Sequence, residues 1–214
     1  MDMLKTKMLR NPERISYDDL KQRIAVINPL YDRALACLAY ASGGRASEVN
    51  KIKKEDLVKE TIENIEYLTI TVKVLKKKKL KVYSETGKKT EKTKDDSGLP
   101  ITRKYDLMPP QPFFRRALVR MDESWLVQPI LEFAEGYKEG KDVLFPIHRA
   151  TLYKKLTSAL KINPHGFRKL RATHLVQKYG YTGHQLQKFF GWSSSQPSDY
   201  YVRLNVNDLA YGGK

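Results

Sequence analysis

The run of charge between Lys73 and Lys94 most constrains how this chain can fold, because a hydrophobic core cannot hold it. It contains ten lysines and two acids, a net +8 that is half of the +16 of the whole chain. The run begins inside Tyr67–Leu75, which is rich in β-branched residues, and the β-like Leu80–Tyr83 follows after four lysines. A basic run is commonly a solvated loop, but two strands joined by a lysine turn predict a hairpin that offers ammonium groups to phosphates.

Composition narrows the class of protein. The chain has 214 residues, which suits one large domain or two small ones, and 41% hydrophobic residues exclude wholesale disorder. The single cysteine, Cys37, excludes a disulfide scaffold and a cysteine-based zinc site. The most apolar run, Ala34–Tyr40, is far too short to span a bilayer, and no apolar stretch of signal-peptide length follows the basic start. We therefore expect a soluble intracellular protein with a polyanionic partner.

Hydrophobic periodicity predicts a helical region at the start of the chain. Ser16 can cap a helix that runs through Leu20 to Ile27 and has two acids in its first turn. Pro29 can begin a second helix, whose apolar positions recur at helical spacing. The sequence Ser-Gly-Gly at 42–44 breaks this helix, and Arg45–Val49 is predicted to start another.

A β region and a second helical region are expected to follow. The β region runs from about 65 to 84, a polar loop covers 84–98, and Leu99–Arg103 is a candidate third strand. After three prolines a helix is expected from about 113 to 135, whereas 143–146 is ambiguous between strand and turn. Further helices are expected at 148–161, 165–180, 183–190 and 198–203.

A histidine and an arginine share one face of the helix expected at 165–180. His165 and Arg168 are three residues apart, so both side chains can approach one phosphate. Taken alone, such a pair arises easily in a chain that is rich in arginine. Two other histidines, His174 and His184, fit an ordinary basic helix.

Three further motifs give this pair its context. Ser42-Gly-Gly-Arg45-Ala-Ser-Glu48 stands far upstream, Phe189-Phe-Gly-Trp192-Ser-Ser follows the pair, and Tyr201 comes nine residues after Trp192. Together the motifs occur in the order and at the spacing of the tyrosine recombinase (phage integrase) family, which the chain resembles over roughly residues 17–203.

The resemblance implies a fold and a domain organisation. The fold class is α+β, a mostly helical catalytic domain with a small antiparallel sheet of about three strands. The expected parts are an N-terminal tail or linker remnant at 1–15, the catalytic domain at 16–203 and a C-terminal tail at 204–214. Family members usually carry an N-terminal helical domain that completes a clamp around DNA. Here the signature starts near residue 30, so we expect either the catalytic domain alone or a minimal recombinase.

The resemblance also implies a role for each matching residue. Arg45 and Arg168 correspond to the two arginines that bind the non-bridging phosphate oxygens, which suits their bidentate guanidinium groups. His165 corresponds to the histidine that handles the proton of the nucleophile. Trp192 stands where most members have histidine, and its indole N–H can donate a hydrogen bond but cannot shuttle a proton. The alternatives are a salt bridge from Arg45 to Glu48 and a purely core role for Trp192.

The nucleophile and the general acid each have competitors. Tyr200 and Tyr201 are neighbours whose side chains point about 100° apart on a helix, so only one can face the arginines, and the nine-residue offset favours Tyr201. The family lysine follows the second strand of the sheet, which favours Lys76, then Lys78, with Lys73 a more distant choice. The predicted DNA-binding residues are Lys73, Lys77, Lys78, Lys79, Lys88 and Lys89.

The function implied is that of a site-specific recombinase or integrase. It would cleave and rejoin DNA strands through a 3′-phosphotyrosine intermediate, without a metal, a nucleotide or another cofactor. The expected partner is double-stranded DNA in the cytoplasm (the nucleoid or host-cell DNA), with self-association into a tetramer on two sites only when DNA is bound, and no membrane. Two alternatives stay open, a type IB topoisomerase-like relaxing enzyme and a non-catalytic basic DNA-binding module.

Overall fold

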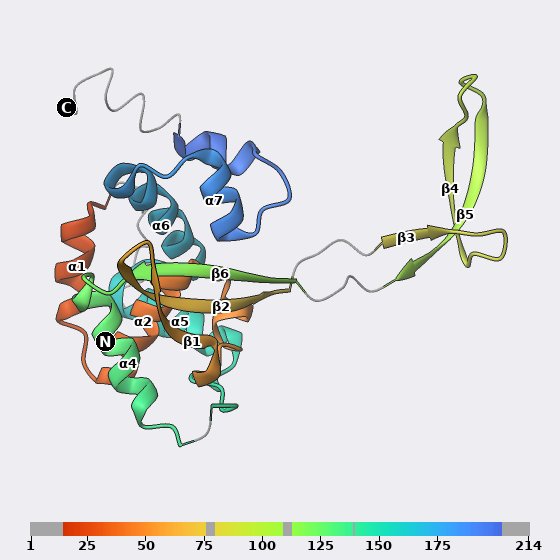
Figure 1. Ribbon diagram of the computed structural model, residues 1–214. Coiled ribbons are helices and arrows are strands. Elements are labelled where there is room, and N and C mark those ends of the chain that lie inside the picture. The colour runs from red at the N-terminus through yellow and green to blue at the C-terminus, as the bar shows by residue number, and fades with distance from the viewer. Residues whose placement is uncertain (1–14, 76–79, 109–112, 139, 203–214) are drawn as a thin grey trace, which may run out of the picture. The chain divides into compact units, whose positions relative to one another are not determined.

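The chain divides into two compact units, each with a sheet of its own. The structure, a computed structural model, describes residues 15–75, 80–108, 113–138 and 140–202. One unit, the core unit, consists of the residues before Val74 and after Phe113, and the other, the insert, is Val74–Phe113. Figure 1 labels the helices and strands of both. The two units are described separately.

The predicted N-terminal helices are confirmed. Helix α1 (Tyr17–Ala25) begins after Ser16, whose hydroxyl accepts a hydrogen bond from the backbone N–H of Asp19 at 3.1 Å. Helix α2 (Leu30–Ser42) begins after Pro29 and ends at Gly43, which adopts the left-handed conformation with φ +54°. The short helix α3 (Ala46–Val49) follows, with Arg45 at its N-cap.

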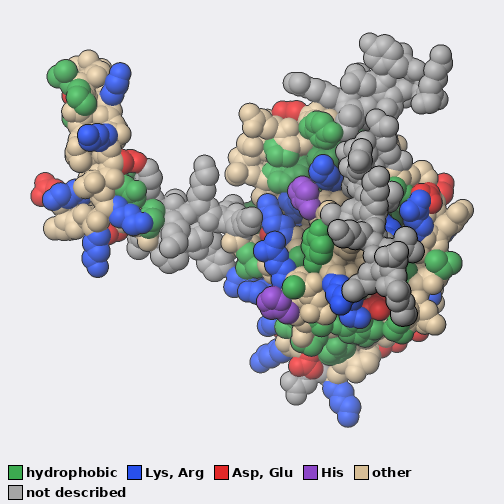
Figure 2. All heavy atoms as spheres, turned by 180° about the vertical axis from the view of Figure 1, so that it is seen from behind, with side chains coloured by type: hydrophobic (Ala, Val, Ile, Leu, Met, Phe, Trp, Pro, Cys, Tyr) green, Lys and Arg blue, Asp and Glu red, His purple; other side chains and the backbone are tan. Residues whose placement is uncertain are grey.

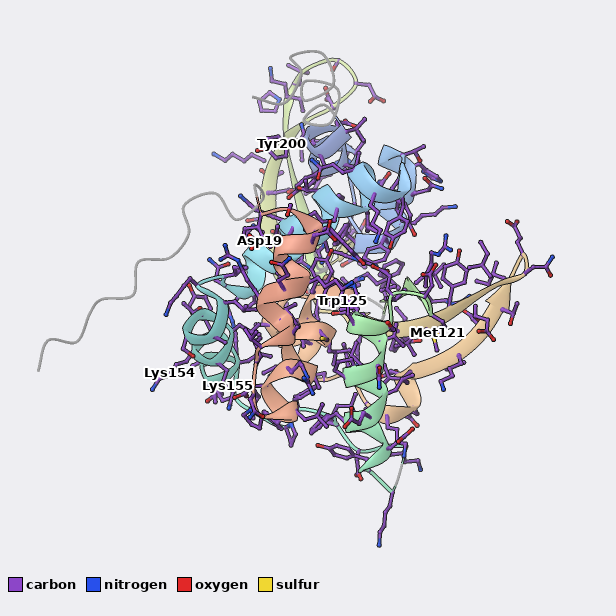
Figure 3. The ribbon with its side chains drawn as sticks, turned by 90° about the vertical axis from the view of Figure 1, so that its left-hand side faces the viewer. Asp19, Met121, Trp125, Lys154, Lys155 and Tyr200 are labelled. Atoms are coloured by element: carbon purple, nitrogen blue, oxygen red, sulfur yellow. The ribbon has the colours of Figure 1, made fainter. Side chains whose placement is uncertain are left out.

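Helix α2 is the centre of the core unit. Every residue from 34 to 42 is buried, because the helix packs on several sides against other helices. Its main neighbours are α4 (Ser124–Glu135) and α6 (Pro164–Tyr179), with α1 and α5 (Arg149–Leu160) also in contact. Trp125 of α4 donates its indole N–H to the hydroxyl of Tyr17 on α1 at 2.9 Å, and Figure 3 labels this tryptophan. A helix with so little exposed surface requires the small residues that this one carries.

The sheet of the core unit has the strand order β1-β2-β6. Strands β1 (Leu57–Ile62) and β2 (Ile65–Val74) pair antiparallel through a tight turn at Glu63 and Asn64, both with positive φ. Strand β1 was not expected from the sequence. The third strand, β6 (Phe113–Arg120), lies on the other side of β2. Alternate residues of β2 from Leu68 to Val74 are buried, so this sheet covers one side of the helical core.

Strand β6 corrects one prediction. The sequence favoured a helix from about 113 to 135, but only α4 at its C-terminal end is helical. Within β6 the buried residues Arg115, Ala117 and Val119 alternate with more exposed ones, which is the period of a strand. The three preceding prolines favour a helix start after them, but the turn before α4 lies at Asp122-Glu123.

The insert corrects two more predictions. Its strands β3 (Leu80–Tyr83), β4 (Lys89–Lys94) and β5 (Pro100–Met108) form an antiparallel sheet in the order β3-β5-β4. The predicted hairpin of 67–75 with 80–83 is therefore wrong, because β2 pairs inside the core unit while β3 pairs with β5. The predicted loop at 84–98 contains β4, whereas the candidate third strand is confirmed within the longer β5. Their closeness in the sequence favoured pairing of 67–75 with 80–83. In the structure β5 is long enough to pair with both β3 and β4.

The C-terminal helices follow the predictions closely. Helices α5 and α6 are followed by α7 (Gly183–Phe190), and residues 196–202 are helical as well. The ambiguous segment 143–146 contributes a single β-bridge between Val143 and Lys53, next to the 3₁₀ turn Lys54–Asp56. The predicted α+β class, mostly helical with three-stranded antiparallel sheets, is confirmed. In the part of the chain that the structure describes, no helix combines the length and apolar character needed to cross a membrane.

His174 belongs to the core, in agreement with its interpretation as an ordinary helix residue. It is 1% exposed, with Nε2 2.8 Å from the carbonyl oxygen of Ile15 and Nδ1 2.8 Å from the hydroxyl of Tyr40. Because a carbonyl only accepts, Nε2 carries the proton and Nδ1 accepts from the tyrosine. Burial lowers the pKa of His174 to about 4, so the ring is neutral at pH 7.

This buried ring predicts a pH dependence of stability. A histidine with a folded pKa of about 4 and an ordinary value of 6.5 takes up its proton more readily when unfolded, so stability falls as the pH drops between those values. From pH 7 to pH 5 the free energy of unfolding should fall by about 2 kcal/mol more in the wild type than in His174→Gln. Urea denaturation at the two pH values measures the difference. His184→Gln, on an exposed position of α7, is the control and should behave as the wild type; an equal loss in His174→Gln would contradict the prediction.

Candidate active site

Arg45 is held at the start of α3 by a carboxylate on its own helix. Glu48 accepts the backbone N–H of Arg45 at Oε2, 2.9 Å, and its Nη1 at Oε1, 2.8 Å. The Glu48 side chain is fully buried, whereas 34% of the Arg45 side chain stays exposed. The salt bridge expected as an alternative to the phosphate-binding role is therefore present, and it leaves part of the guanidinium accessible.

Arg168 joins three segments that are distant in the sequence. It lies on α6 with 4% exposure, and its Nη1 donates to the carbonyl oxygen of Gly43 at 2.7 Å. Its Nη2 donates to the carbonyl oxygen of Phe190 at 2.8 Å. The guanidinium carbon also lies 4.8 Å from the ring centre of Phe190 and 5.6 Å from that of Trp192. The arginine is thus fixed between the turn before Arg45 and the end of α7.

The left-handed turn at Gly43 makes this arrangement possible. A Cβ atom at Gly43 would lie 2.4 Å from Cε1 of Phe190, so no side chain fits between the turn and that ring. Its φ of +54° is one that residues with side chains rarely adopt. Gly191, with φ +63°, ends α7 in the same way just before Trp192. Glycines at both turns bring the two carbonyl groups to Arg168.

Arg115 is a buried arginine that the sequence analysis missed. It comes from β6 with 3% exposure, and its Nη1 donates to the carbonyl oxygen of Phe189 at 2.6 Å. Its Nη2 lies 4.0 Å from Oε2 of Glu48, which is also the carboxylate that holds Arg45. Its Nε and Nη2 make no hydrogen bond within the described residues. The alternation of Arg115 with buried Ala117 and Val119 was the signal for an inward-facing position, and the helix assignment concealed it.

The electrostatics of the cluster favour an anion. Burial, followed by the charges of Arg115 and Arg45, lowers the pKa of Arg168 to about 9. Burial also lowers the pKa of Arg115 to about 10. Burial would raise the pKa of Glu48, but its hydrogen bonds to Arg45 more than offset this and the pKa is lowered. At neutral pH three guanidinium groups therefore face one carboxylate, and a bound phosphate would relieve their repulsion.

His165 stands at the start of α6 beside this cluster. Asn163 caps the helix by accepting the N–H of Gly166 at 2.8 Å, and Pro164 occupies the first turn. The His165 side chain is exposed in part, and its pKa is lowered by burial first, then by Lys169, Arg168 and Arg45. A lowered pKa keeps the imidazole neutral at pH 7, so it can accept a proton.

The two adjacent tyrosines have different surroundings. Tyr201 is 8% exposed and stacks on Trp192 with ring centres 5.9 Å apart and planes 7° apart, while Trp192 stacks on Phe190 at 4.7 Å. The phenol of Tyr201 is also among the groups that act electrostatically on Arg168. Tyr200 is 50% exposed and contacts Tyr201 edge-on at 5.2 Å; Figure 3 labels it. Of the two, Tyr201 is the buried one that stacks on Trp192 and acts on Arg168, and its role as the nucleophile stays a prediction.

Comparison with known proteins places this geometry in a family. The sequence model of the phage integrase family matches residues 13–208, nearly the whole chain. The chain belongs to the phage integrase, or tyrosine recombinase, family. It is similar to "Tyrosine recombinase XerA" of Pyrococcus furiosus, with 27% identity over 202 residues that cover 92% of this chain and 59% of the relative.

Solved structures of tyrosine recombinases share the fold. XerH bound to its difH substrate before cleavage has a TM-score of 0.53 at 20% identity, over 95% of this chain and 53% of that one. XerH bound to a palindromic difH substrate after cleavage has a TM-score of 0.56 at 21% identity, over 97% and 52%. XerA recombinase has a TM-score of 0.53 at 16% identity, over 92% and 61%. The chain thus spans between half and two thirds of the length of the tyrosine recombinases it matches.

The predicted lysines are placed only in part. Lys73 is an exposed residue near the end of β2. It lines a hollow of about 280 Å³ together with Glu48, Lys51 and Phe114. Lys88 and Lys89 are exposed on the insert. The favoured Lys76 and its neighbours Lys77, Lys78 and Lys79 lie outside the described residues, so their roles stay predictions.

The placed residues define what the tyrosine recombinase site can do chemically. Two guanidinium groups can bind non-bridging phosphate oxygens, a neutral imidazole can take a proton, and a phenol stacked on an indole can attack. Across the described ranges, no three or more His, Cys, Asp or Glu side chains come together to hold a metal ion. The placed groups are therefore of the kinds that can bind a phosphate and act on it.

The turn at Gly43 gives a test of how tightly the site is built. Gly43→Ala adds left-handed strain and a clash with Phe190, whereas Gly180→Ala, at the same position after α6 with φ +66°, adds only the strain because nothing lies within 4 Å. Gly180→Ala should cost about 1 kcal/mol of unfolding free energy, and Gly43→Ala roughly 1–3 kcal/mol more. Urea denaturation measures both. Equal losses would mean that the ring yields to the methyl group and that the turn is not tightly packed.

Proposed function

We propose that this chain cleaves and rejoins DNA strands as a site-specific recombinase, through a covalent bond between Tyr201 and a 3′ phosphate. The observation that carries the proposal is the stacking of Tyr201 on Trp192 beside Arg168, which Gly43 links to Arg45. The XerH structures that share the fold are described as bound to difH substrate before and after cleavage, which supports duplex DNA as the partner here. A purely structural set of residues would not need three cations around a single carboxylate.

The proposed reaction begins at the phenol. An ordinary tyrosine has a pKa near 10, so at neutral pH it needs a base, and the neutral His165 takes or orients its proton. Tyr201 Oη then forms a bond to phosphorus while the bond to the 5′ oxygen breaks. Arg45 and Arg168 stabilise the charge that develops on the non-bridging oxygens. Trp192 orients the attacking ring and can donate its indole N–H.

The proton that completes cleavage goes to the departing 5′ oxygen, and a lysine, Lys76 by the family pattern, supplies it. The second half of the reaction reverses the first. The phosphotyrosine conserves the energy of the phosphodiester, so a different 5′ hydroxyl can attack it and release Tyr201. We expect neither a metal nor a nucleotide to take part, and we expect four copies of the chain to assemble on two DNA sites.

The nucleophile is tested with a DNA half-site that traps the covalent intermediate. Tyr201→Phe should abolish the protein–DNA adduct while DNA affinity changes little, because the substitution removes only the attacking oxygen. Tyr200→Phe is the matched control and should form the adduct as the wild type does. Denaturing gel electrophoresis scores the adduct. An adduct from Tyr201→Phe together with its loss in Tyr200→Phe would move the role to Tyr200.

The same assay separates the alternatives. Ligation of the trapped strand to a foreign 5′ end is expected of a recombinase, whereas relaxation of a supercoiled plasmid without a second site would favour the topoisomerase-like alternative. Binding with no adduct at all from the wild type would favour a non-catalytic DNA-binding module.

The general acid is tested by changing the leaving group that it protonates. Replacing the 5′ bridging oxygen by sulfur gives a leaving group that departs without a proton. Lys76→Ala should therefore cleave the normal bond slowly and the sulfur-substituted bond at nearly the wild-type rate. Arg45→Ala and Arg168→Ala should lose about 10²–10³-fold on both substrates, because their contribution is to the non-bridging oxygens. Single-turnover rates are compared for alanine variants of Lys73 and of the four lysines at 76–79. Rescue at Lys78 would shift the assignment by two residues, and rescue at none would reject it.

A further inference from the structure

The register of the insert sorts its side chains onto two faces. Residues opposite each other in a sheet share a face, and β4 pairs with β5 from Lys89↔Tyr105 to Lys94↔Pro100. One face, which we call the lysine face, carries Thr90, Lys92, Lys94, Thr102 and Lys104. The other, the tyrosine face, carries Lys89, Glu91, Thr93, Ile101, Arg103 and Tyr105. Neighbouring residues on one strand, such as Arg103 and Lys104, thus belong to opposite faces.

The tyrosine face is packed together. Tyr83 of β3 lies 6.0 Å from Tyr105, ring centre to ring centre, and its hydroxyl donates to Glu91. Arg103 lies directly opposite Glu91 in the register. Ile101 and Tyr105 are half-buried. This face therefore holds the small sheet together.

The lysine face, by contrast, is open. Lys92, Lys94 and Lys104 are all exposed, and none forms an ion pair within the described residues. The only acid on this side of the described sheet is Asp106, whose Oδ1 accepts the backbone N–H of Lys88 at 3.1 Å. Figure 2 shows Lys and Arg side chains on the surface of the insert. Three unpaired ammonium groups on a hydrogen-bonded sheet are a surface for an extended anion.

We propose that the lysine face binds the phosphate backbone of duplex DNA, independently of its sequence. The inference rests on the proposed function, since it assigns a contact to the same substrate. Lys92 and Lys94 project about 7 Å apart along β4, and Lys104 lies diagonally across from Lys92 at a similar separation. Such spacing lets each ammonium meet a separate phosphate, and the two threonine hydroxyls add hydrogen-bond donors.

The chemistry of the face identifies the form of nucleic acid. Lysine and threonine can contact base edges as well as phosphates, but arginine, asparagine and glutamine, which read bases through planar groups, do not occur on this face among the described residues. We therefore expect the face to contribute affinity more than sequence preference. Single-stranded nucleic acid is bound on aromatic rings, and the two tyrosines of the described sheet lie on the opposite face. Both features favour the backbone of a duplex.

The test compares two neighbouring residues of β5. Lys104→Gln and Arg103→Gln each remove one positive charge from an exposed position, but from opposite faces. With the full chain and a duplex of random sequence, Lys104→Gln should make the plot of log Kobs against log salt less steep by about one unit. The double variant Lys92→Gln/Lys104→Gln should lower the slope by about two units and the affinity at 0.1 M salt by tenfold or more, on the order expected for two lost phosphate contacts. Arg103→Gln should leave the slope unchanged.

The outcomes decide the proposal. Equal slopes for Lys104→Gln and Arg103→Gln, or a double variant that binds as the wild type does, would overturn it. A loss confined to single-stranded DNA, or one that depends on the duplex sequence, would overturn the assignment to the backbone. Circular dichroism and thermal melting verify that the variants are folded. Adduct formation by the wild type is scored separately, so failure of the proposed chemistry at Tyr201 is distinguished from failure of the lysine face.

Discussion

Two carbonyl groups hold the buried guanidinium of Arg168, and they come from segments that are distant in the sequence, Gly43 and Phe190. An isolated charge loses several kcal/mol when it leaves water, so Arg168 is tolerated only because Gly43 and Phe190 accept its protons. Each carbonyl is in place because a left-handed glycine ends the helix next to it. The packing of α2, α6 and α7 and the position of Arg168 therefore depend on the same contacts. Lysine could not replace this arginine, because a single ammonium cannot reach both carbonyls and still lie over two rings.

The remaining charges depend on that anchor. Burial, and then the charges of Arg115 and Arg45, lower the pKa of Arg168, so a bound anion would relieve part of the repulsion among these cations. Glu48 compensates for part of this charge and orients Arg45 from a buried position. The cations are thus held in place by contacts within the protein, so binding of an anion would require little reorganisation. A flexible cluster of the same composition would have to arrange its cations at that point.

The sequence predicted the parts of this site that depend on local pattern. Ser16 marked a helix start through its capping chemistry and Pro29 through its fixed φ, and both helices are found. The spacing from Trp192 favoured Tyr201 over Tyr200, and that role stays a prediction. The sequence failed where pairing is non-local. The alternation within residues 113–120 was outweighed by the prolines before them, because the strand is stabilised by β2, which lies far away in the sequence. For the same reason Arg115 could not be recognised as a neighbour of Glu48.

The candidate site of the core unit and the lysine face of the insert use different basic residues. In the core unit the cations of the candidate site are arginines. Their planar guanidinium groups donate hydrogen bonds in fixed directions, to backbone carbonyls and to the carboxylate of Glu48. On the lysine face of the insert the cations are lysines, whose flexible stems suit a backbone contact that needs charge but no fixed angle. The lysine-rich run between Lys73 and Lys94 therefore constrains the fold, because most of its residues have to stay on the surface. It cannot enter the helical core, and a separate small sheet can carry it because only one of its faces, that of Tyr83 and Tyr105, has to be packed.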